Sequence, residues 1–320
     1  MGLVRLNTHK PPLWLPGGHL QTVYPAIFRK VGGVEYRRER LSTSDGDFLL
    51  LDWHTAPATG ENRPLLILSH GFEGDSHRPY IKGMVKALSR VGVDCLAWNF
   101  RSCGGELNHL PRFYHSGATD DLDAVVRHAV QAGYQRIFLA GFSLGGNLTL
   151  KYLGEKRARP AEVERALCFS VPMDLEACSR HLDRTTNHIY QQRFLDSLRV
   201  KVKEKGTRHP EAIDASLLPG IRSVYAFDDI FTGPLHGFRG AADYYTQCSA
   251  KYFIASIGVR TLIINAANDP MVPVDSLPLA EVEQLRNVDF WLTSGGGHCG
   301  FLERQGRYWS EDIAVAFFTA

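Results

Sequence analysis

Hydrophobic residues in this chain form short apolar runs that alternate with stretches of helical periodicity. Continuous apolar runs, which are typical of buried strands, occur at 64–69, 93–99, 137–140, 166–171, 260–266 and 288–292. Apolar residues at helical spacing follow these runs at 79–91, 118–132, 148–153, 277–285 and 311–318. This alternation predicts an α/β fold with a mostly parallel sheet, right-handed crossovers and helices on both faces.

The beginning of the chain departs from this alternation. Two β-prone segments, 34–43 and 48–53, flank Ser44-Asp45-Gly46-Asp47, whose central Asp-Gly is a turn signal. They predict an antiparallel hairpin, which makes the sheet mixed. Residues 1–33 are rich in Pro, Gly and His, and we expect an extended arm with a short helix near 19–28.

The alternation also stops between residues 172 and 249. This segment contains a predicted Lys- and Arg-rich helix at 190–205 and clusters of aromatic residues, but no buried strand. We expect it to be an insertion that forms a helical cap over the carboxyl edge of the sheet. The α/β core would then comprise residues 1–171, including the arm, and 250–320.

A glycine-rich turn joins the run at 137–140 to the helix that follows it. Its sequence, Gly141-Phe142-Ser143-Leu144-Gly145-Gly146, contains G-x-S-x-G between a strand and a helix, the context of a nucleophile elbow. Such a turn holds the serine in a sparsely populated backbone conformation, and small neighbours keep the strand and helix from colliding. Ser143 is therefore the candidate nucleophile. The alternative is an ordinary glycine-rich turn, because the bare motif is common by chance.

A serine nucleophile needs a base, and the base needs an orienting acid. Where an elbow of this kind occurs, the chain order is Ser, then Asp or Glu, then His. His298 lies in a glycine-rich loop between the last predicted strand and the last helix, which distinguishes it from the other histidines. For the acid we prefer Asp269 to Asp275, because Asp269 is closer to the strand end, where α/β sheets build their sites. Asp269 before Pro270 could also be a simple turn former.

Two backbone amides are candidates for an oxyanion hole, which requires preorganised donors. One is the N–H of Leu144, directly after the nucleophile, and the other is the N–H of Phe72, in the loop after the run at 64–69. We expect His70 to support this loop rather than to act as a second base. Cys299, next to His298, is expected to pack in the interior.

Composition and charge exclude several classes of function. The chain has 320 residues, 44% of them hydrophobic, as in an ordinary globular protein with a large core. A net charge near +2 gives no footprint for nucleic acid. No His or Cys pairs occur at the spacing of metal ligands. The glycine-containing stretch from Arg101 to Glu106 could be read as a phosphate loop, but neither it nor any other loop has the G-x-x-x-x-G-K-[ST] spacing. We therefore expect no metal and no cofactor.

The cysteines and the hydropathy predict the compartment. None of the six cysteines forms a C-x-x-C pair, which indicates free thiols in a reducing environment. We find no apolar core of a signal peptide and no window long enough to span a bilayer. A cytoplasmic location without an integral membrane segment is expected, while transient contact with a membrane surface stays open.

Together these motifs resemble the YheT-like branch of the α/β-hydrolase superfamily. The stretches GHLQT and YHSG-x-TDDL are specific to the resemblance. The segments that carry it are 18–25, 70–74, 99–101, 112–117, 119–122, 243–245 and 297–301, besides the elbow. It implies a mixed eight-stranded sheet with a helical cap, and a triad of Ser143, Asp269 and His298. Ser102 and Asn268 depart from the residues usual in that branch, and neither departure removes a catalytic group.

The resemblance also implies an activity. We expect a serine carboxylesterase that hydrolyses short- to medium-chain or lipid-like acyl esters through an acyl-enzyme, with a small-molecule ester as its partner. If an alcohol replaced water, the reaction would be acyl transfer. A non-catalytic member of the fold that binds an apolar ligand is the alternative of a different class, although such a protein would not need all three triad residues.

Overall fold

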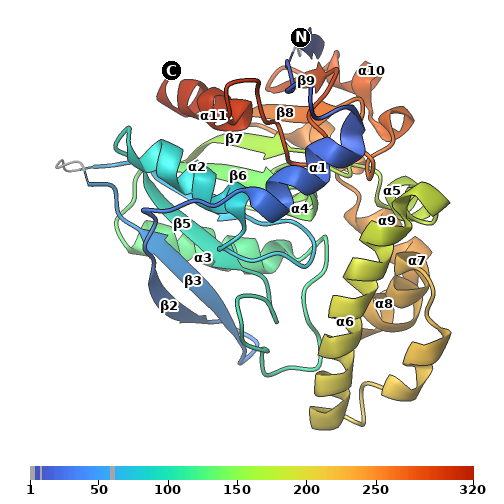
Figure 1. Ribbon diagram of the computed structural model, residues 1–320. Helices are drawn as coiled ribbons and strands as arrows, with labels where there is room; N and C mark the ends of the chain where they lie inside the picture. Colours follow the sequence, from blue (N-terminus) through green and yellow to red (C-terminus); the bar gives the residue numbers. More distant parts are fainter. Residues whose placement is uncertain (1–3, 8, 58–61) are drawn as a thin grey trace.

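One nine-stranded sheet organises the residues described by the computed structural model, 4–7, 9–57 and 62–320 (Figure 1). The strand order is β1-β9-β8-β7-β6-β4-β5-β3-β2. The strands are β1 (Val4–Asn7), β2 (Arg37–Ser42), β3 (Phe48–His54), β4 (Leu65–Ser69), β5 (Asp94–Asn99), β6 (Ile137–Phe142), β7 (Val163–Phe169), β8 (Arg260–Ala266) and β9 (Val288–Thr293). The predicted mixed α/β fold is confirmed.

The sheet is parallel except at the edge formed by β2 and β3. These two strands are antiparallel to each other, and β3 is antiparallel to β5. The expected number of eight strands was one too few, because β1 was taken for an extended arm. β1 pairs in parallel with β9, where Val4 lies opposite Phe290. A strand of four residues carries too little pattern to be recognised without its distant partner.

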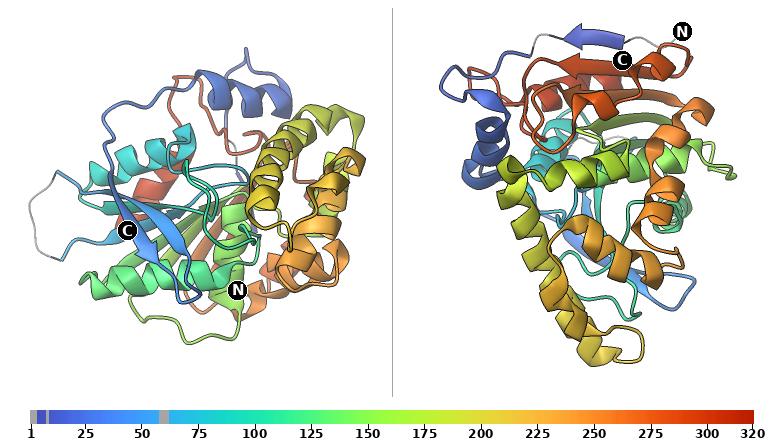
Figure 2. Two further views of the ribbon diagram at one scale, coloured as in Figure 1. Left: turned by 90° about the horizontal axis from the view of Figure 1, so that it is seen from below. Right: turned by 90° about the vertical axis from the view of Figure 1, so that its right-hand side faces the viewer.

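Helices cover both faces of the sheet (Figure 2). Residues of β4 alternate between the two cores, with Leu65 and Ile67 on one side and Leu66 and Leu68 on the other. The first core is closed by α3 (Thr119–Gln131) and α4 (Leu144–Gly154), and the second by α2 (Pro79–Ser89) and α11 (Trp309–Thr319). A further helix, α1 (Gly17–Phe28), precedes the hairpin.

Between β7 and β8 the chain is helical, and these helices extend beyond the sheet in Figure 2. They are α5 (Leu175–Leu182), α6 (His188–Arg208), α7 (Val224–Phe227), a π-helical turn (Asp228–Thr232), α8 (Gly233–Leu235) and α9 (Ala241–Cys248); α10 (Leu279–Val282) follows β8. Short 3-10 turns at 185–187, 215–220, 250–252, 254–256 and 274–276 complete the chain. Leu195, Val202 and Phe227 belong to an apolar cluster within this segment. Its description as a cap bounded by residues 172 and 249 stays a prediction.

Candidate active site

Ser143 occupies a strained turn between β6 and α4. Its backbone angles are φ 54° and ψ −122°, a region that L-residues rarely adopt. The turn is held in place because the Ser143 N–H donates to the carbonyl of Phe169 at 2.9 Å. A Cβ on Gly145 would lie 2.4 Å from the carbonyl oxygens of Ser69 and His70. Glycine is therefore required here for the helix to approach β4, as the motif predicted.

Asp269 and His298 meet although 29 residues separate them in the chain. Asp269 follows β8, and His298 lies in the loop after β9. The Nδ1–H of His298 donates to Oδ2 of Asp269 at 2.8 Å. The other carboxylate oxygen, Oδ1, accepts the N–H groups of Met271 and Val272. Asp269 is buried, whereas Asp275 is exposed in a 3-10 turn, so the structure pairs His298 with the acid that was preferred from the sequence.

The environment of His298 favours its protonated form. Burial of the ring alone would lower its pKa, but the charge of Asp269 and the hydrogen bond to it raise the pKa well above 6.5. Because Nδ1 is occupied by Asp269, Nε2 is the ring nitrogen that remains to exchange a proton with another group.

Two cavities meet at Ser143 and His298, and they also share Phe72, Phe194 and Met271. The inner cavity, about 90 Å³, extends beneath the helices between β7 and β8. Its lining is largely apolar and includes Phe113, Leu144, Leu175, Leu182, Leu198, Val224, Tyr244 and Val272. The outer cavity, about 300 Å³, is lined by α1, by loop 71–80 and by the first turns of α6. A group bound at Ser143 can thus extend in two directions.

The loop that carries Phe72 abuts Ser143, the candidate nucleophile. A Cβ on Gly71 would lie 3.2 Å from the Cβ of Ser143. The N–H of Leu144 is the first of α4, whose initial amides have no partner within the helix. Ser143 therefore lies close to the loop that carries the candidate donor Phe72 and directly precedes Leu144, the other candidate donor.

Glu73 and His70 fix this loop. The carboxylate of Glu73 accepts hydrogen bonds from Tyr114 and Lys201, at 2.7 Å each, and from Ser197. His70 donates through Nδ1 to the carbonyl of Gly71 and accepts the N–H of Phe100 at Nε2. Burial lowers the pKa of His70 to about 4, so the ring is neutral, and these contacts agree with the supporting role expected for it.

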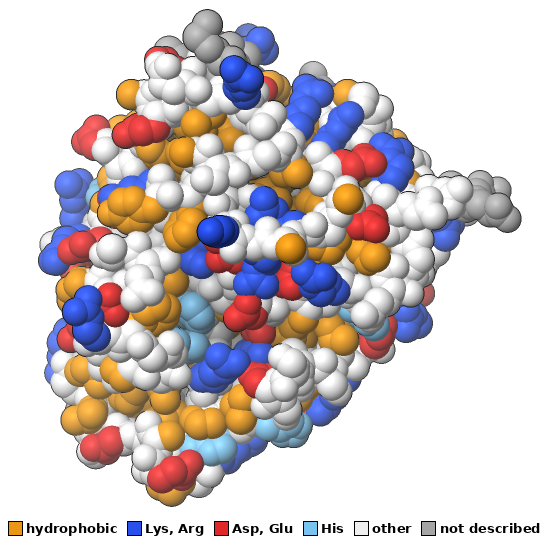
Figure 3. Space-filling model, turned by 180° about the vertical axis from the view of Figure 1, so that it is seen from behind, with side chains coloured by type: hydrophobic (Ala, Val, Ile, Leu, Met, Phe, Trp, Pro, Cys, Tyr) orange, Lys and Arg blue, Asp and Glu red, His pale blue; other side chains and the backbone are white. Residues whose placement is uncertain are grey.

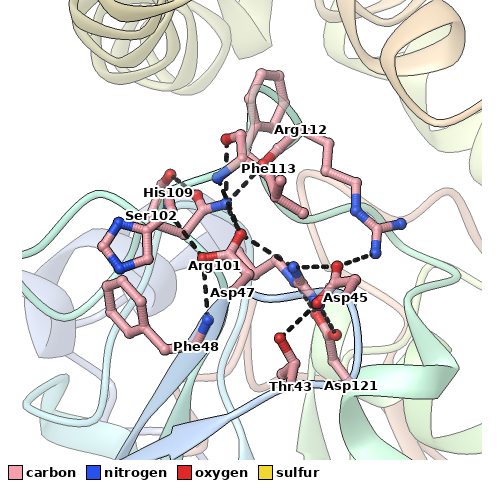
Figure 4. A network of polar contacts seen from close by, with 12 residues as sticks. Thr43, Asp45, Asp47, Phe48, Arg101, Ser102, His109, Arg112, Phe113 and Asp121 are labelled. Carbon is pink, nitrogen blue, oxygen red and sulfur yellow. Dashed lines mark hydrogen bonds and ion pairs between the residues drawn. The ribbon is translucent and has the colours of Figure 1, made fainter.

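Arg101 anchors the loop that forms one wall of the inner cavity (Figure 4). Its buried guanidinium pairs with Asp45, Asp47 and Asp121. Asp47 in turn accepts the N–H groups of residues 109 and 110, just before Phe113. Since all of these donors are occupied within the protein, this loop serves the cavity wall and does not offer its arginine to a phosphate.

Helix α1 holds the loops of both Asp269 and His298, a role that the sequence did not reveal. Oε1 of Gln21 accepts from the side-chain amide of Asn268 and from the N–H of Gly296. Oγ of Thr22 accepts the N–H of His298 at 2.8 Å. A Cβ on Gly18 would lie 1.7 Å from the carbonyl oxygen of Asn268, so only glycine permits this approach. The available signal was the adjacent polar pair Gln21-Thr22 in a mostly apolar segment.

We expect the substitution Gln21→Met to loosen the site. It leaves the N–H of Gly296 and the amide of Asn268 without their acceptor, which costs about 1–3 kcal/mol when such groups stay buried. Urea unfolding should show this loss, and kcat should fall because the His298 loop is less firmly held. The exposed Gln284→Met is the control; equal stability of the two variants would contradict a bracing role for Gln21.

One of the six cysteines, Cys299, lies beside this centre. All six cysteines are free; five are buried, and the half-buried Cys299 packs against the core beneath α2 and α11 and also lines the outer cavity. Among the described residues, no three His, Cys, Asp or Glu side chains are arranged to hold a metal ion.

Comparison with known proteins identifies the family. The family model described as alpha/beta hydrolase fold matches residues 64–305. The chain is 36% identical over 287 residues to YheT of Escherichia coli (strain K12), a protein named as an esterase, which covers 89% of this chain and 84% of YheT. The chain belongs to the α/β-hydrolase family. The resemblance to the YheT-like branch is confirmed.

This α/β-hydrolase also has mammalian relatives and similar solved structures. Human phospholipase ABHD3 is 32% identical over 313 residues, which cover 94% of this chain and 76% of ABHD3. The Pyrococcus furiosus esterase Pf2001 superposes with a TM-score of 0.59 at 18% identity and covers 98% of both chains. Est1E from Butyrivibrio proteoclasticus gives 0.58 at 17% identity over 88% of this chain and 98% of its own. At these identities the structures show the common fold.

Proposed function

We propose that this α/β-hydrolase is a serine carboxylesterase with Ser143 as nucleophile, His298 as base and Asp269 as orienting acid. The enzyme class, a carboxylic ester hydrolase, follows from relatives named as esterase, phospholipase and monoacylglycerol lipase. The observation that carries the assignment of residues is the 2.8 Å hydrogen bond between Asp269 and His298 beside two cavities that Ser143 also lines.

The proposed reaction has two stages, acylation of Ser143 and hydrolysis of the acyl-enzyme, and the same groups act in both. Ser143 Oγ attacks the ester carbonyl while Nε2 of His298 takes its proton, and the N–H groups of Phe72 and Leu144 stabilise the oxyanion. His298 then gives the proton to the leaving alcohol, and an acyl-enzyme remains. Water attacks this acyl group with His298 again as base, which releases the carboxylic acid and restores the Ser143 hydroxyl.

The two cavities suit different parts of an ester substrate. The inner cavity is apolar and small, which suits an acyl chain of short to medium length. The larger outer cavity carries Arg78, Arg193 and Tyr190 among its lining residues and suits the alcohol part. Esters of rising acyl length should therefore show a maximum in kcat/KM rather than a steady increase.

A fluorophosphonate probe tests the proposal, because it labels only an activated serine. We expect wild-type protein to be labelled at Ser143 and the Ser143→Ala variant to remain unlabelled. Ser179→Ala is the matched control, since this hydroxyl also lines the inner cavity, and it should label like wild type. Absence of labelling in wild type, or labelling that survives Ser143→Ala, would instead favour a non-catalytic ligand-binding protein.

A further inference from the structure

The outer side of α1 exposes a continuous apolar face. Residues 20, 24, 27 and 28 follow one another at helical spacing, and Leu13 and Trp14 lie just before the helix. Trp14 contacts Tyr24 edge-on at 4.8 Å between ring centroids, and Tyr24 contacts Phe28 at 5.1 Å. Relative exposure reaches 80% for Leu13, 58% for Trp14 and 63% for Phe28. We call Leu13, Trp14, Leu20, Tyr24, Ile27 and Phe28 the α1 apolar face.

This face adjoins the entrance to the proposed active site. Ile27 of α1 and Ile189 of α6 both line the outer cavity, and they are 62% and 67% exposed, so they stand at its rim. The two helices are in contact there, since the ring of His19 stacks on Tyr190 at 5.7 Å. The inner side of α1 holds the loops of Asp269 and His298 through Gln21 and Thr22, so the apolar face is rigidly attached to the site.

The charged residues of α1 and its flanks are basic; among them, Arg29 is paired with Glu311 of α11. Residues 1–34 contain no aspartate or glutamate, and Lys10 and Lys30 are exposed on either side of the helix. Arg193, also exposed, lines the outer cavity. The opposite face of the molecule differs, because basic and acidic side chains are interspersed over it (Figure 3). Aromatic and aliphatic residues flanked by lysines are the composition of helices that lie in the interface of anionic membranes.

Within the described residues, no helix combines the length and the apolar character that crossing a bilayer requires. We propose that the α1 apolar face docks reversibly on the surface of an anionic lipid bilayer, which places the rim of the outer cavity against the lipid. An ester dissolved in the bilayer then reaches Ser143 through the outer cavity without crossing water. The docking is inferred from the exposed apolar and basic residues alone, whereas its consequence for catalysis rests on the proposed function.

Vesicle binding tests the docking separately from catalysis. Ser143→Ala protein is mixed with vesicles of phosphatidylcholine and phosphatidylglycerol, and bound protein is measured by co-sedimentation. The double substitution Leu20→Ser and Phe28→Ser should weaken binding at least about tenfold, since each removes an apolar group that enters the lipid. The control pair, Val200→Ser and Leu217→Ser, removes comparable exposed side chains elsewhere and should bind like the parent. Failure of the parent to bind, or equal effects of both pairs, would overturn the proposal.

Activity measurements then connect docking to turnover. With active enzyme, the Leu20→Ser and Phe28→Ser pair should leave the hydrolysis of a monomeric, water-soluble ester unchanged and slow that of an ester embedded in vesicles. Lack of hydrolysis of the soluble ester by wild type would refute the proposed function but not the docking, which sedimentation decides. Light scattering tests the alternative that a second copy of the chain covers this face. If wild type were a dimer that did not bind vesicles, and the Leu20→Ser and Phe28→Ser variant were a monomer, the face would be a self-association surface and the proposal would be overturned.

Discussion

A Ser143→Gly variant is expected to hydrolyse a soluble ester on the order of 10⁶-fold more slowly than wild type, the loss measured when the triad serine of subtilisin is removed. Loss of the hydroxyl abolishes the acyl-enzyme, and only oxyanion stabilisation and binding remain. Ser143→Ala should lose the same activity. Substantial residual activity in either variant would show that Ser143 is not the nucleophile.

The two variants should differ in stability. Ser143 has φ 54°, which costs a residue with a Cβ about 1–3 kcal/mol and costs glycine little. Glycine loses about 0.4–1 kcal/mol through the greater entropy of its unfolded chain. The strain is the larger effect, so Ser143→Gly should be more stable than Ser143→Ala by about 1 kcal/mol in urea unfolding. Equal stability would mean that no strain is stored at the elbow.

Much of the fold was readable because strands inside the sheet, such as β4 and β6, are buried apolar runs. The polar and largely exposed β2 was readable from the Asp-Gly turn that follows it. β1 could not be predicted in this way, since its four residues form a strand only by pairing with β9 near the other end of the sequence. The π-helical turn Asp228–Thr232, which contacts α7, α8 and α9, was not predicted either.

The candidate site likewise contains residues that the sequence predicted and residues that it did not. Ser143, Asp269 and His298 each follow a recognisable strand, so their order and loop positions predicted them. Gln21 was not predicted, because its partner Asn268 lies 247 residues further along the chain and only the folded sheet brings them together. Lys201 and Glu73, which join α6 to the loop of Phe72, are likewise distant in sequence. The residues proposed to react could thus be inferred from local sequence, and the residues that position them could not.

Asp269→Asn is expected to lower kcat/KM about 10³- to 10⁴-fold, as comparable changes do in other triads. Oδ2 of Asp269 accepts from His298, and Oδ1 accepts from the N–H groups of Met271 and Val272, so both oxygens face donors. An asparagine must turn its NH₂ towards one set of donors. Facing His298, it would favour the tautomer with a proton on Nε2, which cannot accept the proton of Ser143.

The pH profile gives a second readout of the same pair. Asp269 raises the pKa of His298 well above 6.5, and catalysis requires the neutral ring, so wild-type kcat/KM should rise with pH through a pKa above that value. In Asp269→Asn the raising charge is gone, and the residual activity should appear at lower pH. Asp275→Asn, which changes an exposed carboxylate, should keep both the rate and the profile of wild type. If Asp275→Asn had the larger effect, or if the profile of Asp269→Asn did not move, His298 would not owe its basicity to Asp269.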